Sequence, residues 1–262
     1  MAEKFLEGVP DGLRVLVTAG AAGIGRVIAD TFLAHGARVH ACDVDAAAVA
    51  EFDDSHPNAS ATQADVSDRA QIDALFADLA ERFGGLDVLV NNAGIAGPTA
   101  GVDQIDPDAW DQTVDINMSG QFNCARRAAP LLRATGDGAM INIASVAGRL
   151  GYAYRLPYAA TKWGVVGMTA SLAKELGPDG VRVNALLPGI VEGPRIDRVI
   201  ADRAQTVGVS FEEMKQQYRD KASLRRMVSA QDVADMALFL CSRHGRNISG
   251  QPISVCANVE TL

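Results

Sequence analysis

Tyr158, Lys162 and Ser145 are the residues whose types and spacing best suit proton chemistry. Tyr158 and Lys162 are four positions apart, so on a helix they lie on one face, one turn from each other. A phenol is a weak acid with a pKa of about 10, and a fixed ammonium beside it favours the phenolate. A serine hydroxyl at the end of a neighbouring strand could hydrogen-bond the oxygen whose proton is leaving. The trio therefore suits reversible proton transfer to a carbonyl or an alcohol, provided that the fold brings it together.

Apolar runs of strand length alternate with helix-period segments along the whole chain. The expected strands are Leu13–Thr18, Val39–Asp43, Ala61–Ala64, Asp87–Asn91, Ala139–Ala144, Val181–Leu187 and Gln251–Val255. The expected helices are Ile24–His35, a helix from Ser67 as N-cap to Phe83, Asp106–Arg133, Pro157–Leu176, and two that begin at capping-box sequences at Ser210 and Ser229. This alternation implies right-handed crossovers between parallel strands. We therefore expect an α/β fold, a doubly wound parallel sheet of about seven strands with helices on both faces.

Residues 1–262 are expected to form a single domain, because open α/β sheets of this length often remain undivided. Only the segment 189–221, between the sixth strand and the later helices, lacks a clear register. Such a stretch in a compact α/β domain is often a lid or substrate loop. A surface helical insertion that contacts no ligand explains it equally well.

The composition argues against several classes of function. The net charge of −8 disfavours nucleic-acid binding, which depends on basic patches. No stretch approaches the roughly 20 continuous apolar residues of a membrane span, and residues 1–10 do not resemble a signal peptide. The four histidines lack metal-ligand spacing, and the four cysteines are widely spaced. We expect a cytoplasmic protein with reduced cysteines, no metal site, and no nucleic-acid or membrane partner.

A glycine-rich turn follows the first expected strand and precedes a helix, with the sequence Thr-Ala-Gly-Ala-Ala-Gly-Ile-Gly at residues 18–25. Glycines in such a turn let backbone amides approach a pyrophosphate at the positive end of the helix. Asp43 ends the second strand, near the position at which an acid meets the adenosine ribose hydroxyls. A carboxylate there repels the 2′-phosphate of NADP, and no arginine or lysine lies in the turn or in the two positions after Asp43. NAD is therefore favoured, although Asp45 competes for the role and Asp43 could be only a solvated acid.

Two further segments end at the same carboxyl edge of the expected sheet. Asp65 and Val66 follow the third strand and could meet the adenine edge. Asn91, Asn92, Ala93 and Gly94 end the fourth strand. In open α/β sheets, ligands bind at this edge, where the strand order reverses. Asn91 suits a structural role better, because it can satisfy backbone groups at the strand end.

Taken together, these motifs resemble the classical short-chain dehydrogenase/reductase family over nearly the whole chain. The residues that carry the resemblance are Thr18, Gly20, Gly23, Ile24 and Gly25, Asn91–Gly94, Ser145, Tyr158 with Lys162, and Pro188 with Gly189. The resemblance implies a Rossmann-type fold. It also implies an oxidoreductase that transfers hydride between a nicotinamide and a carbinol or carbonyl carbon.

The resemblance assigns roles to four catalytic residues. Tyr158 is the general acid/base, Lys162 favours its phenolate and binds the nicotinamide ribose, and Ser145 orients the substrate oxygen. Asn117 would hold a water that feeds a proton relay through Lys162, although a mid-helix asparagine can also bond locally. The cofactor-binding set implied is Gly20, Ala22, Gly23, Ile24, Gly25, Asp43, Asp65, Val66, Asn92, Ala93, Gly94, Tyr158, Lys162, Pro188, Gly189 and Val191.

The chain departs from the family pattern at two places. After Pro188-Gly189 the family commonly has a threonine that bonds the nicotinamide carboxamide, whereas this chain continues Ile-Val-Glu-Gly at residues 190–193. The last strand usually continues into Asp-Gly-Gly, whereas residues 255–258 read Val-Cys-Ala-Asn. Both the carboxamide contact and the packing of the tail are therefore open.

The substrate is only weakly encoded. Arg149, Tyr152 and Arg155 lie between Ser145 and Tyr158, and Arg195 lies in the candidate lid. Guanidinium groups recognise carboxylate, sulfonate or phosphate, so an anionic hydroxy or keto compound is one hypothesis. The alternative is that the arginines pair with acids such as Glu192. The apolar residues Leu150, Leu156 and Val191 suit an uncharged alcohol equally well.

We expect an NAD-dependent oxidoreductase that interconverts a secondary alcohol, or a hydroxy acid, and its carbonyl. A preference for NAD favours oxidation of the alcohol in the cell. One alternative is a 3-oxoacyl thioester reductase of the same family, which normally uses NADP and a basic surface. The other is a non-catalytic dinucleotide-binding sensor or scaffold. The family suggests a homotetramer or homodimer built on Asp106–Arg133 and Pro157–Leu176.

Overall fold

The computed structural model describes residues 6–259, without the side chains of residues 195, 202, 206 and 207. Seven parallel strands form one sheet in the order β3-β2-β1-β4-β5-β6-β7. They are β1 (Arg14–Thr18), β2 (Arg38–Asp43), β3 (Ala59–Gln63), β4 (Val88–Asn91), β5 (Ala139–Ile143), β6 (Arg182–Pro188) and β7 (Pro252–Val255). The order reverses between β1 and β4. The predicted doubly wound parallel sheet is therefore confirmed.

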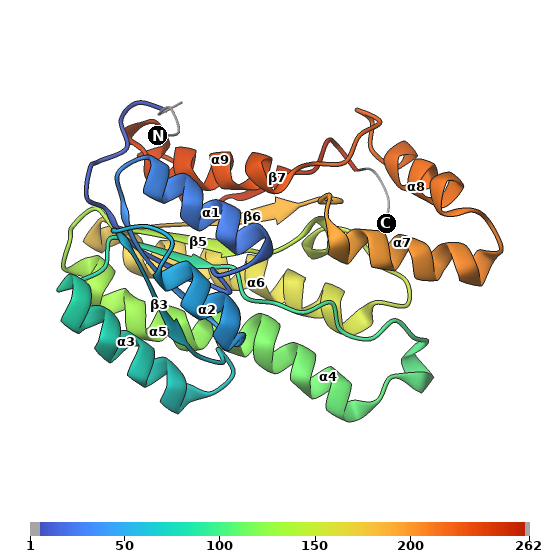
Figure 1. The fold of residues 1–262 in the computed structure, drawn as a ribbon, viewed down its shortest axis with the longest axis horizontal. Helices are drawn as coiled ribbons and strands as arrows, with labels where there is room; N and C mark the ends of the chain where they lie inside the picture. Colours follow the sequence, from blue (N-terminus) through green and yellow to red (C-terminus); the bar gives the residue numbers. More distant parts are fainter. Residues whose placement is uncertain (1–5, 260–262) are drawn as a thin grey trace.

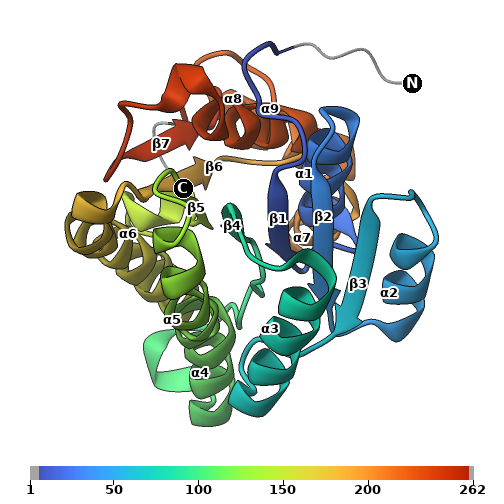
Figure 2. The same cartoon turned by 90° about the vertical axis from the view of Figure 1, so that its left-hand side faces the viewer.

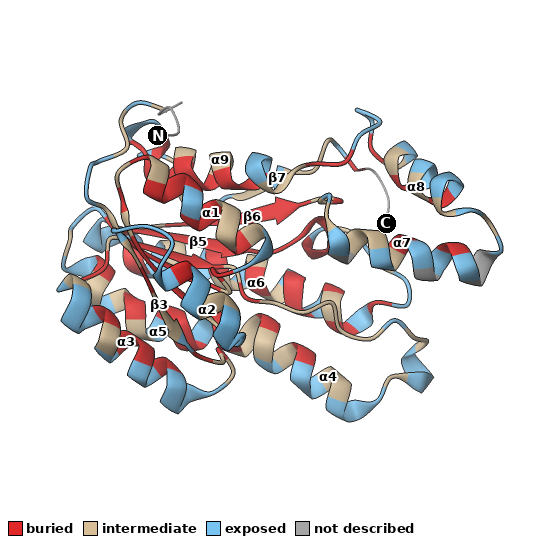
Figure 3. Ribbon diagram, viewed as in Figure 1, coloured by how far each residue is buried: buried red, intermediate tan, exposed pale blue. Residues whose placement is uncertain are grey.

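Helices cover both faces of the sheet (Figures 1 and 2). On one face lie α1 (Gly23–Ala34) and α9 (Ala230–Cys241), and on the other lie α3 (Arg69–Phe83), α5 (Gly120–Arg133) and α6 (Leu156–Leu176). Successive residues of β1 feed the two cores, because Val15 and Val17 pack toward α1 while Leu16 packs toward α3. The inner strands are buried between the layers (Figure 3), whereas the edge strands β3 and β7 are mostly half-buried. Within residues 6–259 no helix is both long and apolar enough to cross a membrane.

Two aspartates, rather than the expected serine, begin the helices around β3. Asp68 caps α3, because its carboxylate accepts hydrogen bonds from the amides of Ala70 and Gln71 at 2.8 and 3.2 Å. The predicted cap at Ser67 is wrong, since its hydroxyl instead donates to Asp65. Asp45 caps α2 (Ala46–Asp53), a short helix that the sequence did not predict. The predicted capping boxes at Ser210 and Ser229 are confirmed.

The long helix expected over Asp106–Arg133 changes its winding in the middle. It begins as α4 (Pro107–Val114), with Asp106 as N-cap, and continues after a π-helical turn at Asp115–Ser119 into α5. The amide of Gly120 donates to the carbonyl of Asp115, five residues back. Such π turns are frequent at functional sites, and this one contains Asn117.

The segment 189–221 folds into α7 (Pro194–Val207) and α8 (Phe211–Asp220), which extend past the carboxyl ends of the strands (Figure 1). A separate small core holds the two helices together, and it includes Ile200, Met214 and Tyr218. The same core contains Val259 from the tail, which forms an antiparallel bridge to Ala222 just after α8. These helices pack on each other and on the tail, which explains why their pattern did not fit the register of the sheet.

Candidate active site

A cavity of about 590 Å³ opens at the carboxyl edge of the sheet. Its lining includes the turn after β1, Asp43 at the end of β2, and Tyr158 and Lys162 on α6. Residues 188–194, which lead from β6 into α7, line it as well. The strand order reverses at β1 and β4, so the cavity lies where open α/β sheets bind ligands.

Tyr158, Lys162 and Ser145 all line this cavity. Lys162 is 4% exposed, and its Nζ donates to the carbonyl of Ile143 at 2.9 Å while lying 5.7 Å from the centre of the Tyr158 ring. Ser145 follows β5, and its Oγ accepts a hydrogen bond from the amide of Ala147 at 3.2 Å. That contact fixes the hydroxyl oxygen at the strand end and leaves its proton available to another acceptor.

Asn117 lies behind the cavity lining and is fully buried. Its Oδ1 accepts from the amide of Ile95 at 2.7 Å, and its Nδ2 donates to the carbonyl of Ile95 at 3.0 Å. The side chain therefore fastens the loop after β4 to the helix layer. A Cβ added at Gly94 would lie 3.1 Å from Asn117 Oδ1 and 3.5 Å from Lys162 Nζ, so this close approach requires glycine or a small shift of its neighbours.

The glycine-rich turn is held in place by the end of β4. Thr18 Oγ1 accepts hydrogen bonds from the amides of Asn92 and Ala93 at 2.9 and 3.0 Å. Asn92 Nδ2 in turn donates to the carbonyls of Thr18 and Ala19 at 3.0 and 3.1 Å. The turn after β1 and the loop after β4 are thus hydrogen-bonded to each other where Ala19 and Asn92 line the cavity.

The glycines of the turn are required for different physical reasons. A Cβ at Gly20 would lie 2.7 Å from the carbonyl of Val17, and a Cβ at Gly25 would overlap that of Ala19, so both are needed for close packing. Gly23 has φ +56° and open space around it, and it lines the cavity with Ala22 and Ile24. Ala19 also adopts a positive φ, +48°, which the sequence did not suggest.

The two candidate acids after β2 separate in the structure. Asp45 accepts hydrogen bonds from the amides of Ala47 and Ala48 as the N-cap of α2. Asp43 is half-buried and lines the cavity. Of the two, only Asp43 lines the cavity, and its contact with a ribose stays a prediction.

Several expected cofactor residues do not line the cavity, namely Gly20, Gly25, Asp65, Val66 and Ala93. Asp65 Oδ1 accepts from the amide and hydroxyl of Ser67 at 2.8 and 2.7 Å. Val66 is buried against α5, where a Cβ at Gly120 would lie 2.6 Å from its side chain. Contact of Asp65 or Val66 with an adenine stays a prediction.

The four candidate substrate residues are placed differently. Tyr152 and Arg155 line the cavity. Arg149 is exposed and lies outside the lining, where its guanidinium donates to the carbonyl of Pro252 and, at 3.3 Å, to Ser254 Oγ. Arg195 belongs to α7, but its side chain lies outside the described part of the structure.

Tyr218 and Lys221, near the end of α8, also line the cavity, and sequence reasoning did not name them. The capping box at Ser210 predicted their helix. It could not show that the far end of that helix returns to the active-site cavity.

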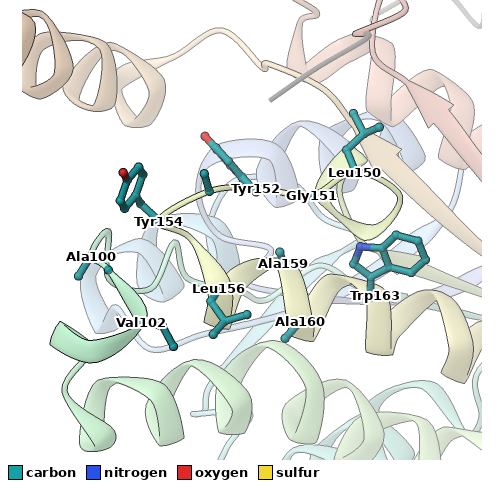
Figure 4. A pocket seen from close by; sticks show the side chains of 12 residues that line it. Ala100, Val102, Leu150, Gly151, Tyr152, Tyr154, Leu156, Ala159, Ala160 and Trp163 are labelled. Atoms are coloured by element: carbon teal, nitrogen blue, oxygen red, sulfur yellow. The ribbon is translucent and has the colours of Figure 1, made fainter.

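An open apolar groove of about 810 Å³ lies beside the cavity (Figure 4). It runs along α6 past Leu156, Ala160 and Trp163, and Tyr152 borders both spaces. In Figure 4 the Tyr152 ring points away from Leu156 and Trp163.

Comparisons with known proteins show the family of the chain. Residues 19–257 match the family model described as enoyl-(acyl carrier protein) reductase. The chain is 34% identical over 245 residues to a 3-oxoacyl-[acyl-carrier-protein] reductase of Staphylococcus aureus, covering 92% of this chain and 95% of that one. It is 35% identical over 235 residues to the 2-dehydro-3-deoxy-L-rhamnonate dehydrogenase (NAD(+)) of a Sphingomonas species, covering 88% of each.

A solved structure is similar over almost its full length. The crystal structure of a variant of actinorhodin polyketide ketoreductase with NADPH matches with a TM-score of 0.89 and 32% identity, covering 98% of both chains. The family model and the curated relatives each span most of the chain. The chain therefore belongs to the classical short-chain dehydrogenase/reductase family and is an oxidoreductase of that family.

Proposed function

We propose that this protein interconverts a secondary alcohol and its carbonyl with NAD as cofactor and Tyr158 as general acid/base. The observation that carries the proposal is that Tyr158, Lys162 and Ser145 border the same cavity as the glycine-rich turn and Asp43. A proton-transfer group and a dinucleotide-binding turn therefore face one enclosed space. This arrangement suits hydride transfer coupled to proton transfer.

The residues present fit a dinucleotide. Gly23 leaves open space at the N-terminus of α1, where backbone amides can meet a pyrophosphate. Hydrogen bonds between Asn92 and Thr18 hold that turn in place. Asp43, the last residue of β2, lines the same cavity. Bound NAD supplies the hydride acceptor for oxidation of the alcohol.

The chain's own residues would handle the proton and the substrate oxygen. In oxidation, Tyr158 takes the hydroxyl proton of the alcohol, and in reduction it returns a proton to the carbonyl oxygen. Ser145 donates a hydrogen bond to the same oxygen and orients it. Lys162, fixed by the carbonyl of Ile143, favours the charged form of Tyr158. Asn117 holds the loop after β4 against α6 through Ile95 and Thr161, next to the lysine that a proton relay would use.

The choice of NAD rests on Asp43. A carboxylate in the cavity at the end of β2 accepts hydrogen bonds from ribose hydroxyls and repels a 2′-phosphate. The relatives differ, since the rhamnonate dehydrogenase is named for NAD(+) and the ketoreductase structure holds NADPH. We therefore expect NAD to bind at least roughly tenfold more tightly than NADP, a difference of about 1.4 kcal/mol.

A second candidate is reduction of a 3-oxoacyl thioester, which the name of the Staphylococcus aureus relative and the apolar groove beside the cavity favour. Asp43 and the net charge of −8 count against NADP and against an acidic carrier protein. Turnover of acetoacetyl thioesters with NADPH, faster than that of simple alcohols with NAD, would decide for this candidate.

Tyr158→Phe tests the mechanism and also the non-catalytic alternative. We expect kcat/KM to fall by roughly 10²–10⁴-fold, because proton transfer by a positioned group contributes about that much. Binding of NAD, measured by fluorescence or calorimetry, should be unchanged. Tyr154→Phe is the matched control, since Tyr154 is 68% exposed and lies outside the cavity lining. Full activity of Tyr158→Phe would overturn the mechanism, and absence of any turnover by the unaltered protein would favour a sensor or scaffold.

A further inference from the structure

Arg155 is a buried cation next to the reactive phenol. It is 7% exposed, and its Nη2 donates to the carbonyl of Ala96 at 2.8 Å. Its Nε is buried without an acceptor, and none of the carboxylates whose side chains the structure describes forms an ion pair with it. Its guanidinium carbon lies 5.2 and 5.0 Å from the ring centres of Tyr152 and Tyr158. Because burial of an unpaired charge is costly, this site would be stabilised by a bound anion.

Lys221 is a second cation of the same cavity. It is half-buried at the end of α8, and its Nζ lies 4.7 Å from the centre of the Tyr218 ring. Burial, and to a smaller extent Arg203, lowers the pKa of Lys221 below its usual value. No acid in the described part of the chain pairs with it. An anion beside it would offset both effects.

Two phenols complete this end of the cavity. Tyr152 and Tyr218 both line it, and neither hydroxyl hydrogen-bonds any side chain or backbone group in the described part of the structure. Burial raises the pKa of Tyr152, so its hydroxyl keeps the proton and can donate it to an acceptor. Four hydrogen-bond donors therefore face one space that supplies them with few acceptors.

We propose that Arg155, Lys221, Tyr152 and Tyr218 bind an oxyanion of the substrate, so that the enzyme acts on a short hydroxy or keto compound that carries a carboxylate or sulfonate. This inference rests on the proposed function, because it places the reacting carbinol at Tyr158. The guanidinium of Arg155 lies beside the Tyr158 ring, so only a short chain fits between the anion and the reacting carbon.

The charges of the cavity agree with this assignment. Two acids line it, Asp43 after β2 and the exposed Glu192 before α7, and Glu192 forms no ion pair with any side chain that the structure describes. In a chain with a net charge of −8, Arg155 beside the Tyr158 ring and Lys221 beside the Tyr218 ring form a local positive field in the cavity. Such a field attracts anionic ligands and disfavours neutral ones of equal size.

The test compares short hydroxyalkanoates, hydroxyalkanesulfonates and the neutral hydroxyamides of the same length as substrates with NAD. We expect kcat/KM for the oxyanions to exceed that for the amides. Arg155→Met should lower the oxyanion value by roughly 30- to 1,000-fold, as loss of one partner of a buried charge contact does, and the amide value far less. Lys221→Met should lower kcat/KM for the oxyanions by roughly tenfold. Comparison of the hydroxyalkanoates with the hydroxyalkanesulfonates shows whether the site prefers a carboxylate or a sulfonate.

Lys174→Met is the matched control. Lys174 is an exposed residue of α6, the helix that Arg155 precedes as N-cap, and the substitution removes the same single positive charge. Arg155→Lys should restore part of the oxyanion activity. Equal losses for oxyanions and amides in Arg155→Met and Lys221→Met would show that Arg155 only positions Tyr158, and would overturn the proposal.

A binding measurement separates this inference from the proposed function. Tyr158→Phe saturated with NAD should bind a hydroxyalkanoate more tightly than the corresponding amide, and Lys221→Met in that background should reduce the preference by roughly tenfold. If neutral alcohols are oxidised but no oxyanion binds preferentially, the anion site is wrong and the oxidoreductase assignment stands. If no alcohol of any class is oxidised, the proposed function fails first.

Discussion

Ala19 adopts a φ of +48° in the turn that would approach the cofactor. For a residue with a Cβ, this left-handed conformation costs about 1–2 kcal/mol. The neighbouring contacts enforce it, since the carbonyl of Ala19 accepts a hydrogen bond from Asn92 and packs against Gly25. Strain at this position is therefore balanced by the link between β1 and β4.

Ala19→Gly should stabilise the protein. Relief of the strain exceeds the added chain entropy of glycine, which is about 0.5–1 kcal/mol, and leaves a net gain of up to about 1 kcal/mol. Urea denaturation measures the change. Ala21→Gly, a buried alanine of the same turn whose φ is not left-handed, should instead destabilise. A loss of stability in Ala19→Gly would show that the methyl group contributes more through packing than it costs in strain.

The sequence indicated which types of residue the site needs. It did not indicate which of two nearby residues of the same type lines the cavity. Asp43 and Asp45 were both suitable acids, and only the start of α2 shows that Asp45 is occupied as an N-cap. Arg149 and Arg155 are close together in sequence, yet one bonds β7 at the surface and the other is buried in the cavity. These differences depend on long-range packing, which spacing along the chain does not encode.

Among the elements, α7 contributes Pro194, Ile196 and Val199 to the cavity lining. Gly193 precedes it with φ +142° and ψ +175°, a conformation that is essentially restricted to glycine. A Cβ there would meet no atom within 4 Å, so any effect of substitution comes from the backbone alone. Gly193 also lines the cavity, so this conformation sets where α7 begins beside the substrate.

Gly193→Ala should raise KM for the substrate by about tenfold, because strain of about 1–3 kcal/mol will shift the start of α7. Steady-state kinetics measures the change. Gly208→Ala is the control, since Gly208 ends the same helix with φ +78° and equally open space, but lies outside the cavity lining. It should cost stability without a change in KM. Equal KM values in both variants would argue against a substrate role for the segment 189–221.

Most elements were predictable because they follow simple patterns. The seven strands lie within one or two residues of their predicted bounds at most ends, since buried parallel strands are continuous apolar runs. The helix α2 was missed because it buries only Phe52 and so has no apolar period. The π turn at Asn117 was missed for a different reason, because residue spacing does not distinguish α from π winding.

At the scale of the whole molecule, His40 makes stability depend on pH. Its ring is fully buried on β2 and contacts the hydroxyls of Ser60 and Thr62 at 2.7 and 3.0 Å. Burial lowers the pKa of His40 to about 4, and the nearby carboxylate of Asp78 opposes this shift only in part. The unfolded chain therefore binds a proton more readily than the folded one. The contribution of His40 to the free energy of unfolding is fully present above about pH 6.5 and is lost as the pH falls toward 4.

Between pH 7 and pH 5, the free energy of unfolding should fall by about 2 kcal/mol through this residue. Urea titrations at the two pH values measure the change, and His40→Gln should remove most of it. His244→Gln, at an exposed histidine, should leave the fall in place. The same fall in His40→Gln as in the unaltered protein would assign the acid sensitivity to another group.

The predicted homotetramer or homodimer stays a prediction. Its suggested helices carry Phe122 on α5 and Trp163 on α6, which are 50% and 52% exposed. That the chain forms one domain also stays a prediction. Sequence patterns cannot decide either point, since an apolar residue on a helix face can pack on the sheet or on another subunit.

The bridge between Val259 and Ala222 has a practical consequence for anyone who purifies or immobilises this protein. A tag or fusion partner joined beyond Val259 would pull on the stretch that secures Lys221, and could change substrate preference without touching the catalytic trio. Near the opposite terminus, the carbonyl of Gly8 accepts a hydrogen bond from the amide of Arg243, just after α9, and neither residue lines the cavity. Attachment ahead of Leu6 is accordingly the safer choice for kinetic work.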